Sequence, residues 1–324
     1  MRNKPLLICL LFSFICASVW AQATVNNYKV FLATANLGSK NLLIIRKFEQ
    51  SGNTNYLAVD LNTIETQILR ADKLKTNAIS WQKLYSDYAT TPYIKALAYA
   101  KKQSFALQDA GIIHGWPKEK GITLTIDLCP SHKPLDRVIF TSLLSEFGKI
   151  EKPVPIALSI TGRFMLDHPD DMQWLKELQT KGDINITWVN HTYNHHYDPK
   201  IPLAENFLLE PTTNIDFEVL QTEIALIDHQ LLPSVFFRFP GLVSDNTVTN
   251  SIINYGLIPI GSDAWLAKGQ KANSGSIVLI HGNGNEPLGV ADFIKLLQSE
   301  KQQVFEKQWL LYDLKESISE EFKQ

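Results

Sequence analysis

The stretch Gly121–Asp127, which reads GITLTID, decides the fold. Its residues alternate with a period of two, so Thr123, Thr125 and Asp127 share one face of an extended strand, and the leucine and isoleucine between them occupy the other. Further β-rich, apolar runs follow along the chain, and helical patterns separate most of them. This alternation predicts an α/β fold whose parallel strands are joined by helices.

The elements of this fold are expected throughout the second part of the chain. We expect strands at Gly121–Asp127, Pro155–Thr161, Ile184–His191, Val235–Pro240, Leu257–Asp263 and Ser276–His281. We expect helices at Leu135–Gly148, Asp170–Gly182, Asp216–Leu232, Thr247–Tyr255 and Gly289–Val304. In a barrel of parallel strands, the carboxyl ends converge on one face, where the loops build the active site.

Polar residues stand at these carboxyl ends. Each expected strand but one ends in, or just before, a residue that can carry chemistry: Asp127, His191, Arg238, Asp263 and His281. Composition alone would not place them all at the same end of their strands. The sequence therefore predicts an active site at one mouth of the barrel.

The residues before this region form a different pattern. Three short β-like runs occur at Tyr28–Leu32, Leu42–Ile45 and Tyr56–Asp60, with turn-forming residues between them, and a helical stretch follows at Trp81–Ala110. We expect residues 24–116 to form a small α+β unit, and residues 117–324 to form the barrel.

The first 23 residues resemble a secretory signal peptide. Arg2 and Lys4 precede the apolar run Pro5–Cys16, and small residues follow it. The apolar run is short for a membrane span, which needs about 20 residues. We therefore expect an exported protein, in the periplasm, in the cell envelope or secreted, with no stable membrane span once the signal is removed.

Net charge and cysteine content exclude two features: a nucleic-acid partner and an internal disulfide framework. The chain has 31 basic and 33 acidic residues, and loss of Arg2 and Lys4 leaves 29 against 33, a formal charge of −4. Such a balance gives no reason to expect a nucleic-acid partner. Cys9 and Cys16 lie in the signal, so Cys129 alone remains and no internal disulfide framework is possible.

His191 and His195 are candidate metal ligands. On a helical turn, a spacing of four places both imidazoles on one face, where they can bind a single ion. Two histidines at this spacing often simply face solvent, but their position after a β run favours a site. Asp127 can act as a general base if a cation keeps it ionised, and Arg238 can be that cation, although a surface ion pair is the plainer explanation.

Three other residues suggest a general acid and a contact with sugar. Asp263 bonded to His281 would orient the imidazole and favour its protonated form, so the pair can act as a general acid. Taken alone, His281 is more simply explained as a buried histidine whose ring nitrogens form structural hydrogen bonds. Trp265 can line a sugar-binding groove, although a tryptophan there is more often part of the core.

Together these residues resemble a known family. The segments Thr125–Pro130, His191–His195, Arg238–Pro240, Asp263–Trp265 and Leu279–His281 are similar, in order and approximate spacing, to the five motifs of the NodB-homology polysaccharide deacetylases, carbohydrate esterase family 4. The resemblance covers roughly residues 117–318. It implies a distorted (β/α) barrel and a metal-dependent hydrolase that removes N-acetyl groups from a polysaccharide or glycan of the cell envelope.

The resemblance also implies roles for individual residues. His191 and His195 would hold a divalent metal, usually zinc in this family, and Asp127 matches the base that deprotonates the attacking water. Arg238 would orient Asp127, and Asp263 would orient His281, the acid that protonates the leaving amine. Trp265 and Phe239 are expected to contact the N-acetylated carbohydrate polymer.

The chain departs from the family at Leu128. The family normally has a second aspartate there as the third metal ligand, and leucine cannot bind metal. Three explanations remain open: Asp127 itself turns to the metal, a carboxylate such as Asp136 or Asp198 fills the gap, or the metal is lost. Cys129 is a conceivable soft ligand, but a buried structural thiol is the more common role.

Two rival functions follow. Loss of the metal would leave a catalytically silent barrel that binds carbohydrate. A glycosidase on a similar barrel would need two carboxylates flanking the bond, and it gives His191, His195 and Arg238 no role. Because both histidines and the acid and base residues persist, we favour the deacetylase.

Overall fold

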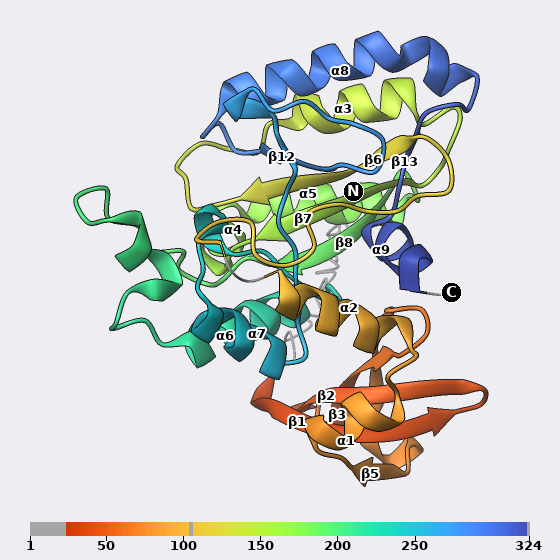
Figure 1. The fold of residues 1–324 in the computed structure, drawn as a ribbon, viewed down its shortest axis with the longest axis vertical. Coiled ribbons are helices and arrows are strands. Elements are labelled where there is room, and N and C mark those ends of the chain that lie inside the picture. Colours follow the sequence, from red (N-terminus) through yellow and green to blue (C-terminus); the bar gives the residue numbers. More distant parts are fainter. Residues whose placement is uncertain (1–23, 104–105, 323–324) are drawn as a thin grey trace, which may run out of the picture.

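A parallel sheet forms the centre of the molecule in the computed structural model, which describes residues 24–103 and 106–322 (Figure 1). Its strand order is β10-β9-β8-β7-β6-β12-β11, with β13 beside β6, and every pairing is parallel. The strands are β6 (Gly121–Leu128), β7 (Val154–Ile160), β8 (Ile184–Asn190), β9 (Pro233–Phe237), β10 (Ile258–Pro259), β11 (Ala264–Trp265), β12 (Ile277–His281) and β13 (Leu310–Leu311).

Helices connect and cover these strands. They are α3 (Arg137–Glu146), α4 (Gly162–Asp167), α5 (Pro169–Thr180), α6 (Ile215–Asp228), α7 (Asn246–Asn254), α8 (Pro287–Phe305) and α9 (Leu314–Phe322). Short 3-10 turns lie at Leu203–Glu205, Phe207–Leu209, Pro240–Leu242 and Leu266–Lys268. Since β10 and β11 are the two ends of the strand order, the barrel is distorted and open. The predicted fold class is confirmed.

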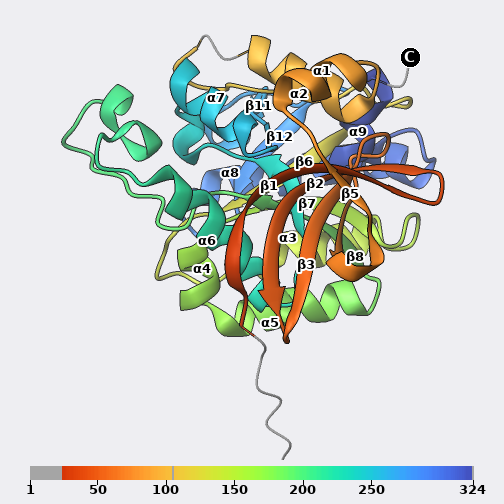
Figure 2. The ribbon, with the colours of Figure 1, turned by 90° about the horizontal axis from the view of Figure 1, so that it is seen from below.

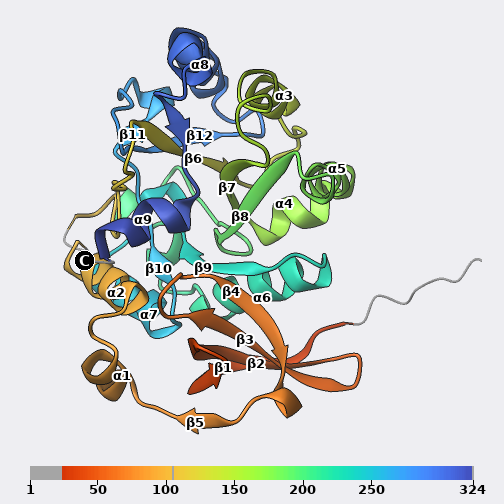
Figure 3. The same ribbon diagram turned by 90° about the vertical axis from the view of Figure 1, so that its right-hand side faces the viewer.

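A second, antiparallel sheet precedes the barrel. Its order is β4-β3-β2-β1-β5. Figures 2 and 3 show it packed beside the barrel, next to α6 and α7. Its elements are β1 (Asn26–Leu37), β2 (Lys40–Gln50), β3 (Asn53–Asp60), β4 (Thr66–Arg70), the turn Ala71–Lys73, β5 (Thr76–Ala78), α1 (Trp81–Asp87) and α2 (Pro92–Lys102). The predicted α+β content is observed, and the division at residue 117 stays a prediction.

A buried ion pair joins the antiparallel sheet to helix α6 of the barrel. Arg46 of β2 donates through Nε (2.7 Å) and Nη2 (2.8 Å) to the carboxylate of Glu223 on α6, and the hydroxyl of Tyr28 donates to the same carboxylate. Around this pair, Leu43 and Ile45 of the antiparallel sheet belong to the same hydrophobic cluster as strand residues of the barrel. The two parts therefore share one continuous core.

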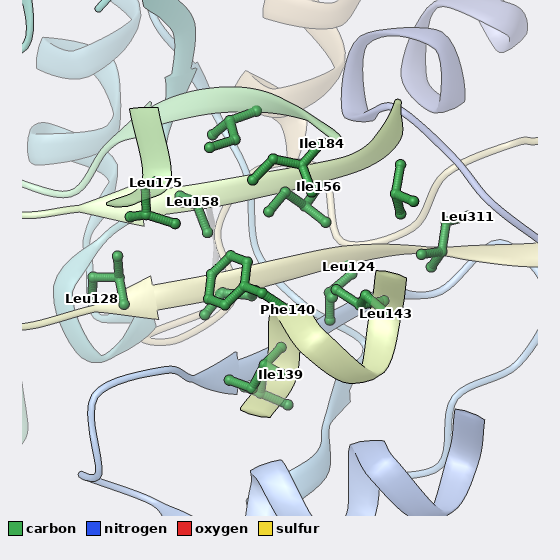
Figure 4. Close-up of a cluster of buried hydrophobic side chains, with 14 of the residues drawn as sticks. Leu124, Leu128, Ile139, Phe140, Leu143, Ile156, Leu158, Leu175, Ile184 and Leu311 are labelled. Atoms are coloured by element: carbon green, nitrogen blue, oxygen red, sulfur yellow. The ribbon is translucent and has the colours of Figure 1, made fainter. Parts of the chain in front are cut away.

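The strand that decides the fold packs as its alternation predicts. Leu124 and Leu128 both belong to the hydrophobic core with residues of α3, and Figure 4 shows Leu124 beside Phe140 and Leu143, with Leu128 further along the strand. Leu128 has no solvent-exposed surface. Its side chain therefore belongs to the core, on the face opposite to Asp127.

The expected strand Leu257–Asp263 is much shorter in the structure. Pro259 lacks the N–H that a longer ladder needs, and β10 ends there. The chain then turns and forms β11, which pairs with β12 in the register Ala264 to Val278. The predicted signal peptide, residues 1–23, lies outside the described residues. Within the described ranges, no helix has both the length and the apolar character needed to cross a membrane.

Candidate metal and acid–base site

Four of the five predicted strand-end residues meet at one end of the sheet. Asp127 and His281 are register partners on the adjacent strands β6 and β12. His191 and Arg238 follow β8 and β9 directly. The carboxyl ends of four parallel strands thus bring these side chains together, as the barrel rule predicts.

The two candidate metal-binding histidines converge through a loop. The expected helical turn is wrong, because residues 191–198 follow β8 as irregular backbone. Thr192 and His195 have positive φ angles of 69° and 51°, a conformation that residues other than glycine adopt rarely and that costs free energy. The turn brings the rings of His191 and His195 to a centroid distance of 4.8 Å.

Hydrogen bonds fix the tautomer of His191. Its Nδ1 lies 2.9 Å from the carbonyl oxygen of Arg238, which can only accept, so Nδ1 carries the proton. In the neutral ring, Nε2 then has a free lone pair, the form in which histidine binds a metal. Nε2 of His195 is also buried, and it has no hydrogen-bond partner among the described residues.

Cys129 completes this cluster. Its Sγ lies 3.5 Å from Nε2 of His191, and the ligand atoms of Cys129, His191 and His195 all lie within 4.8 Å of one another. Burial opposes ionisation of the thiol, but His195, His191 and His281 outweigh burial and lower the pKa of Cys129 well below its usual value. The surroundings of the sulfur thus favour a thiolate.

Asp127 is a buried carboxylate in a field of positive charge. It is 3% exposed, and its Oδ2 lies 3.8 Å from Nε2 of His191. Burial opposes its ionisation, but Arg238, His191 and His281 together outweigh burial and lower the pKa of Asp127. Arg238 is fully buried and donates to Thr125 at 2.8 Å. Asp127 is therefore held ionised, as a base requires.

Asp263 does not orient His281, and this expected pairing is wrong. The carboxylate of Asp263 accepts hydrogen bonds from Nδ1 of His114 (2.7 Å) and from the backbone N–H of Ile277 (3.1 Å). Ile277 is the first residue of β12 and His281 is the last. Asp263 therefore lies at the opposite end of the strand from the site.

Glu286 takes the place expected for Asp263. Its Oε2 accepts a hydrogen bond from Nδ1 of His281 at 2.8 Å and another from the indole N–H of Trp265 at 2.7 Å. Burial opposes protonation of His281, but Cys129, Glu286 and Asp127 outweigh burial and raise its pKa to about 11. The site thus contains a protonated imidazole whose orientation is set by a carboxylate.

An open cleft of about 590 Å³ lies above these residues. Cys129, His195 and His281 contribute to its lining. Further lining residues include Gln108, Tyr197, Leu203, Phe207, Trp265, Lys268 and Glu286. The ring of Tyr197 stacks on that of Phe207 at 5.1 Å. Aromatic faces and hydrogen-bonding groups in one open groove suit a sugar chain.

Phe239 does not line the cleft. It is 1% exposed and packs against Phe237 in a hydrophobic cluster, so the expected contact between Phe239 and the carbohydrate is not found. Phe207 and Tyr197, which sequence reasoning missed, provide the aromatic surface instead. Glu286 was missed as well. Its one signal in the sequence is its place beside Pro287, which predicts a helix start close behind His281.

Several solved structures are similar to this chain in fold. No family model matches the chain. A family 4 carbohydrate esterase from Bacillus anthracis is 17% identical over 68% of this chain and 90% of that one, with a TM-score of 0.48. PdaA, a family 4 carbohydrate esterase from Bacillus subtilis, is 16% identical over 68% and 95%, with a TM-score of 0.45. A CE4 family pseudoenzyme, crystallised as a mutant with restored enzymatic activity, is 14% identical over 92% and 93%, with a TM-score of 0.43.

Proposed function

We propose that this chain is a metal-assisted hydrolase that removes N-acetyl groups from an N-acetylated glycan of the cell envelope. One observation carries the proposal. The imidazoles of His191 and His195, the carboxylate of Asp127 and the imidazole of His281 gather at the carboxyl ends of the parallel strands, where His195 and His281 line an open cleft. This is the set of groups that hydrolysis of an amide requires.

The residues present fit a divalent metal ion. Nδ1 of His191 is held by a backbone carbonyl, and Nε2 of His195 is buried without a partner among the described residues. Ligand histidines characteristically have one nitrogen held in this way and the other free. Such an ion would supply polarisation of the acetamide carbonyl and compensation of the negative charge that develops on its oxygen.

The protein's own groups account for the proton transfers. Asp127 accepts a proton from the water that attacks the carbonyl carbon, and Arg238 keeps Asp127 ionised. A carbon–oxygen bond forms, the carbon–nitrogen bond breaks, and His281 donates its proton to the leaving nitrogen. Glu286 holds the His281 ring through Nδ1, which leaves Nε2 as the nitrogen that faces the cleft. The products are acetate and a free amine on the sugar.

The cleft and the first residues support the substrate class and the location. Tyr197 is 52% exposed and offers an aromatic face on which a sugar ring can pack, with Phe207 stacked behind it and Trp265 in the cleft wall, and the open groove suits a polymer. The signal-like sequence at residues 1–23 supports action outside the cytoplasm on a glycan of the envelope.

The test measures metal content and products together. The wild-type protein and a His191→Ala, His195→Ala double variant are analysed for bound zinc and then incubated with N-acetylated oligosaccharides and peptidoglycan fragments. We expect about one ion per chain in the wild type, acetate with free amines as products, and neither in the double variant.

Other outcomes identify the rival functions. New reducing ends without acetate would show a glycosidase. Glycan binding without turnover, in a protein that holds no metal after zinc or cobalt is supplied, would show a silent carbohydrate-binding barrel.

A further inference from the structure

Cys129 stands one residue beyond Leu128, the position at which the family resemblance predicts a third metal ligand. Strand β6 continues through Leu128, and its alternation places Leu128 in the core between the sheet and α3. The next side chain on the face of Asp127 is that of Cys129. The structure also holds the backbone at this point, because the side-chain amide of Asn283 donates to the carbonyl oxygen of Cys129.

The distances suit a shared ion. Zinc binds sulfur at about 2.3 Å and imidazole nitrogen at about 2.0–2.1 Å, so in a tetrahedral site two such ligands lie about 3.5 Å apart. Sγ of Cys129 lies 3.5 Å from Nε2 of His191, and the atom from His195 completes a group within 4.8 Å. Closing the longest separation in this group from at most 4.8 Å to about 3.5 Å would bring all three atoms to bonding distance of one ion.

The charges favour a cation in this position. Cysteine binds a metal ion as the thiolate, and the buried sulfur of Cys129 lies directly against the His191 ring. Asp127 has a buried Oδ1 without a hydrogen-bond partner among the described residues. This carboxylate lies 3.8 Å from Nε2 of His191, so it adds an acidic group beside the two histidines and the cysteine.

The two carboxylates that the sequence offered as an alternative third metal ligand bond to backbone N–H groups. Asp136 accepts a hydrogen bond from the backbone N–H of Gly284 at 2.8 Å, and Asp198 accepts one from the backbone N–H of Lys200 at 2.9 Å. Asp127 is close to His191 but is not a member of the group formed with Cys129 and His195. The cysteine is therefore the residue that completes a three-ligand set.

We propose that Cys129, with His191 and His195, forms a one-thiolate, two-imidazole site for a thiophilic divalent metal. This inference rests on the metal dependence in the proposed function and deepens it. The thiolate selects zinc, cobalt or cadmium over magnesium or manganese, which prefer oxygen ligands. Cys129 and His195 also line the cleft, so an ion held by them would be accessible from the cleft.

Cobalt spectroscopy tests the proposal on the full protein as purified. Co²⁺ is titrated under reducing conditions into the wild type, Cys129→Ser and Cys129→Asp. We expect about one equivalent bound by the wild type, with an intense near-ultraviolet thiolate-to-cobalt absorption band. Both variants should lose the band. Cys129→Asp, which retains an anionic ligand, should still bind one ion, whereas Cys129→Ser should bind zinc at least about 10-fold more weakly.

The outcomes separate this inference from the proposed function. If the wild type binds cobalt through the histidines, releases acetate from the glycan and shows no thiolate band, the Cys129 proposal is overturned and the deacetylase remains. A wild type that binds no metal overturns both. Because the wild-type spectrum decides the question, misfolding of a variant does not rescue the proposal.

Discussion

Oε2 of Glu286 lies 2.8 Å from Nδ1 of His281, and it is this carboxylate, rather than that of Asp263, which holds the candidate catalytic acid. The same oxygen accepts the indole N–H of Trp265 at 2.7 Å. The cleft wall and the acid are thus connected through one carboxylate. In the proposed function, substrate packing on Trp265 and proton donation by His281 would therefore depend on the same carboxylate.

Glu286 should act as a positioning residue for His281. We expect Glu286→Ala to lower kcat for acetate release by about 10-fold or more, as part of the roughly 10²–10⁴-fold that a general acid contributes. KM should change little. Glu286→Gln should restore part of the rate, because its amide oxygen can still accept from Nδ1. The ¹⁵N chemical shifts of the His281 ring report its protonation state directly.

Asp263→Asn is the matched control for Glu286. Asp263 bonds to His114 at the other end of β12, so its substitution should leave kcat near the wild-type value and the His281 shifts unchanged. A large loss of kcat in Asp263→Asn with none in Glu286→Ala would show that Asp263, as expected from the sequence, orients His281 in solution.

Asp127 should be essential for turnover and dispensable for metal binding. Asp127→Asn removes the base while keeping the size of the side chain, so kcat should fall by about 10²–10⁴-fold. The zinc content, measured on the same samples by atomic emission, should stay at the wild-type level. Parallel loss of zinc and activity would instead identify Asp127 as a metal ligand.

Leu128→Asp should fail to create the family's aspartate ligand. Leu128 is fully buried in the core beside α3, so an aspartate there places an unpaired carboxyl group among apolar side chains. Leu128→Ala should destabilise the protein by about 2–5 kcal/mol, and Leu128→Asp by more, as measured by urea unfolding. A folded Leu128→Asp variant that binds zinc more tightly than the wild type would contradict this placement.

The Arg46–Glu223 pair should join the antiparallel sheet to the barrel. Both side chains are almost completely buried, at 0% and 1% exposure, so Glu223→Ala leaves the Arg46 charge without its partner. Removal of one member of a buried pair typically costs about 3–5 kcal/mol. Thermal and urea unfolding measure the loss.

A surface pair provides the comparison for this prediction. Arg70 and Asp72 are 53% and 52% exposed, and Asp72→Ala should change the free energy of unfolding by less than about 1 kcal/mol. Equal effects of Glu223→Ala and Asp72→Ala on the free energy of unfolding would mean that the buried pair does not stabilise the contact between the antiparallel sheet and the barrel.

Sequence periodicity was sufficient for the architecture. The period-two alternation of Gly121–Asp127 and the helical runs between the later strands predict a parallel sheet with helices, because each element must bury one face. The rule that parallel strands share their carboxyl ends was enough to bring Asp127, His191, Arg238 and His281 together. Both are local or topological properties, which a single sequence contains.

The partners of these residues depended on the tertiary structure. Pro259 ends β10 early, and the register of Ala264 with Val278 then places Asp263 at the wrong end of β12. No periodicity contains that register. The path of the loop after β8 similarly decides that His195 returns to His191 and lies near Cys129.

The sequence by itself thus determined the sheet, its helices and the end at which the chemistry gathers, because hydrophobic patterning and chain direction act locally. Only the tertiary structure decided that Glu286 orients His281, that Phe239 is core, and that Cys129 lies with the two histidines. Hydrogen-bond and metal-ligand geometry depends on distances of a few tenths of an ångström. Such distances arise only when strand register, loop path and core packing act together.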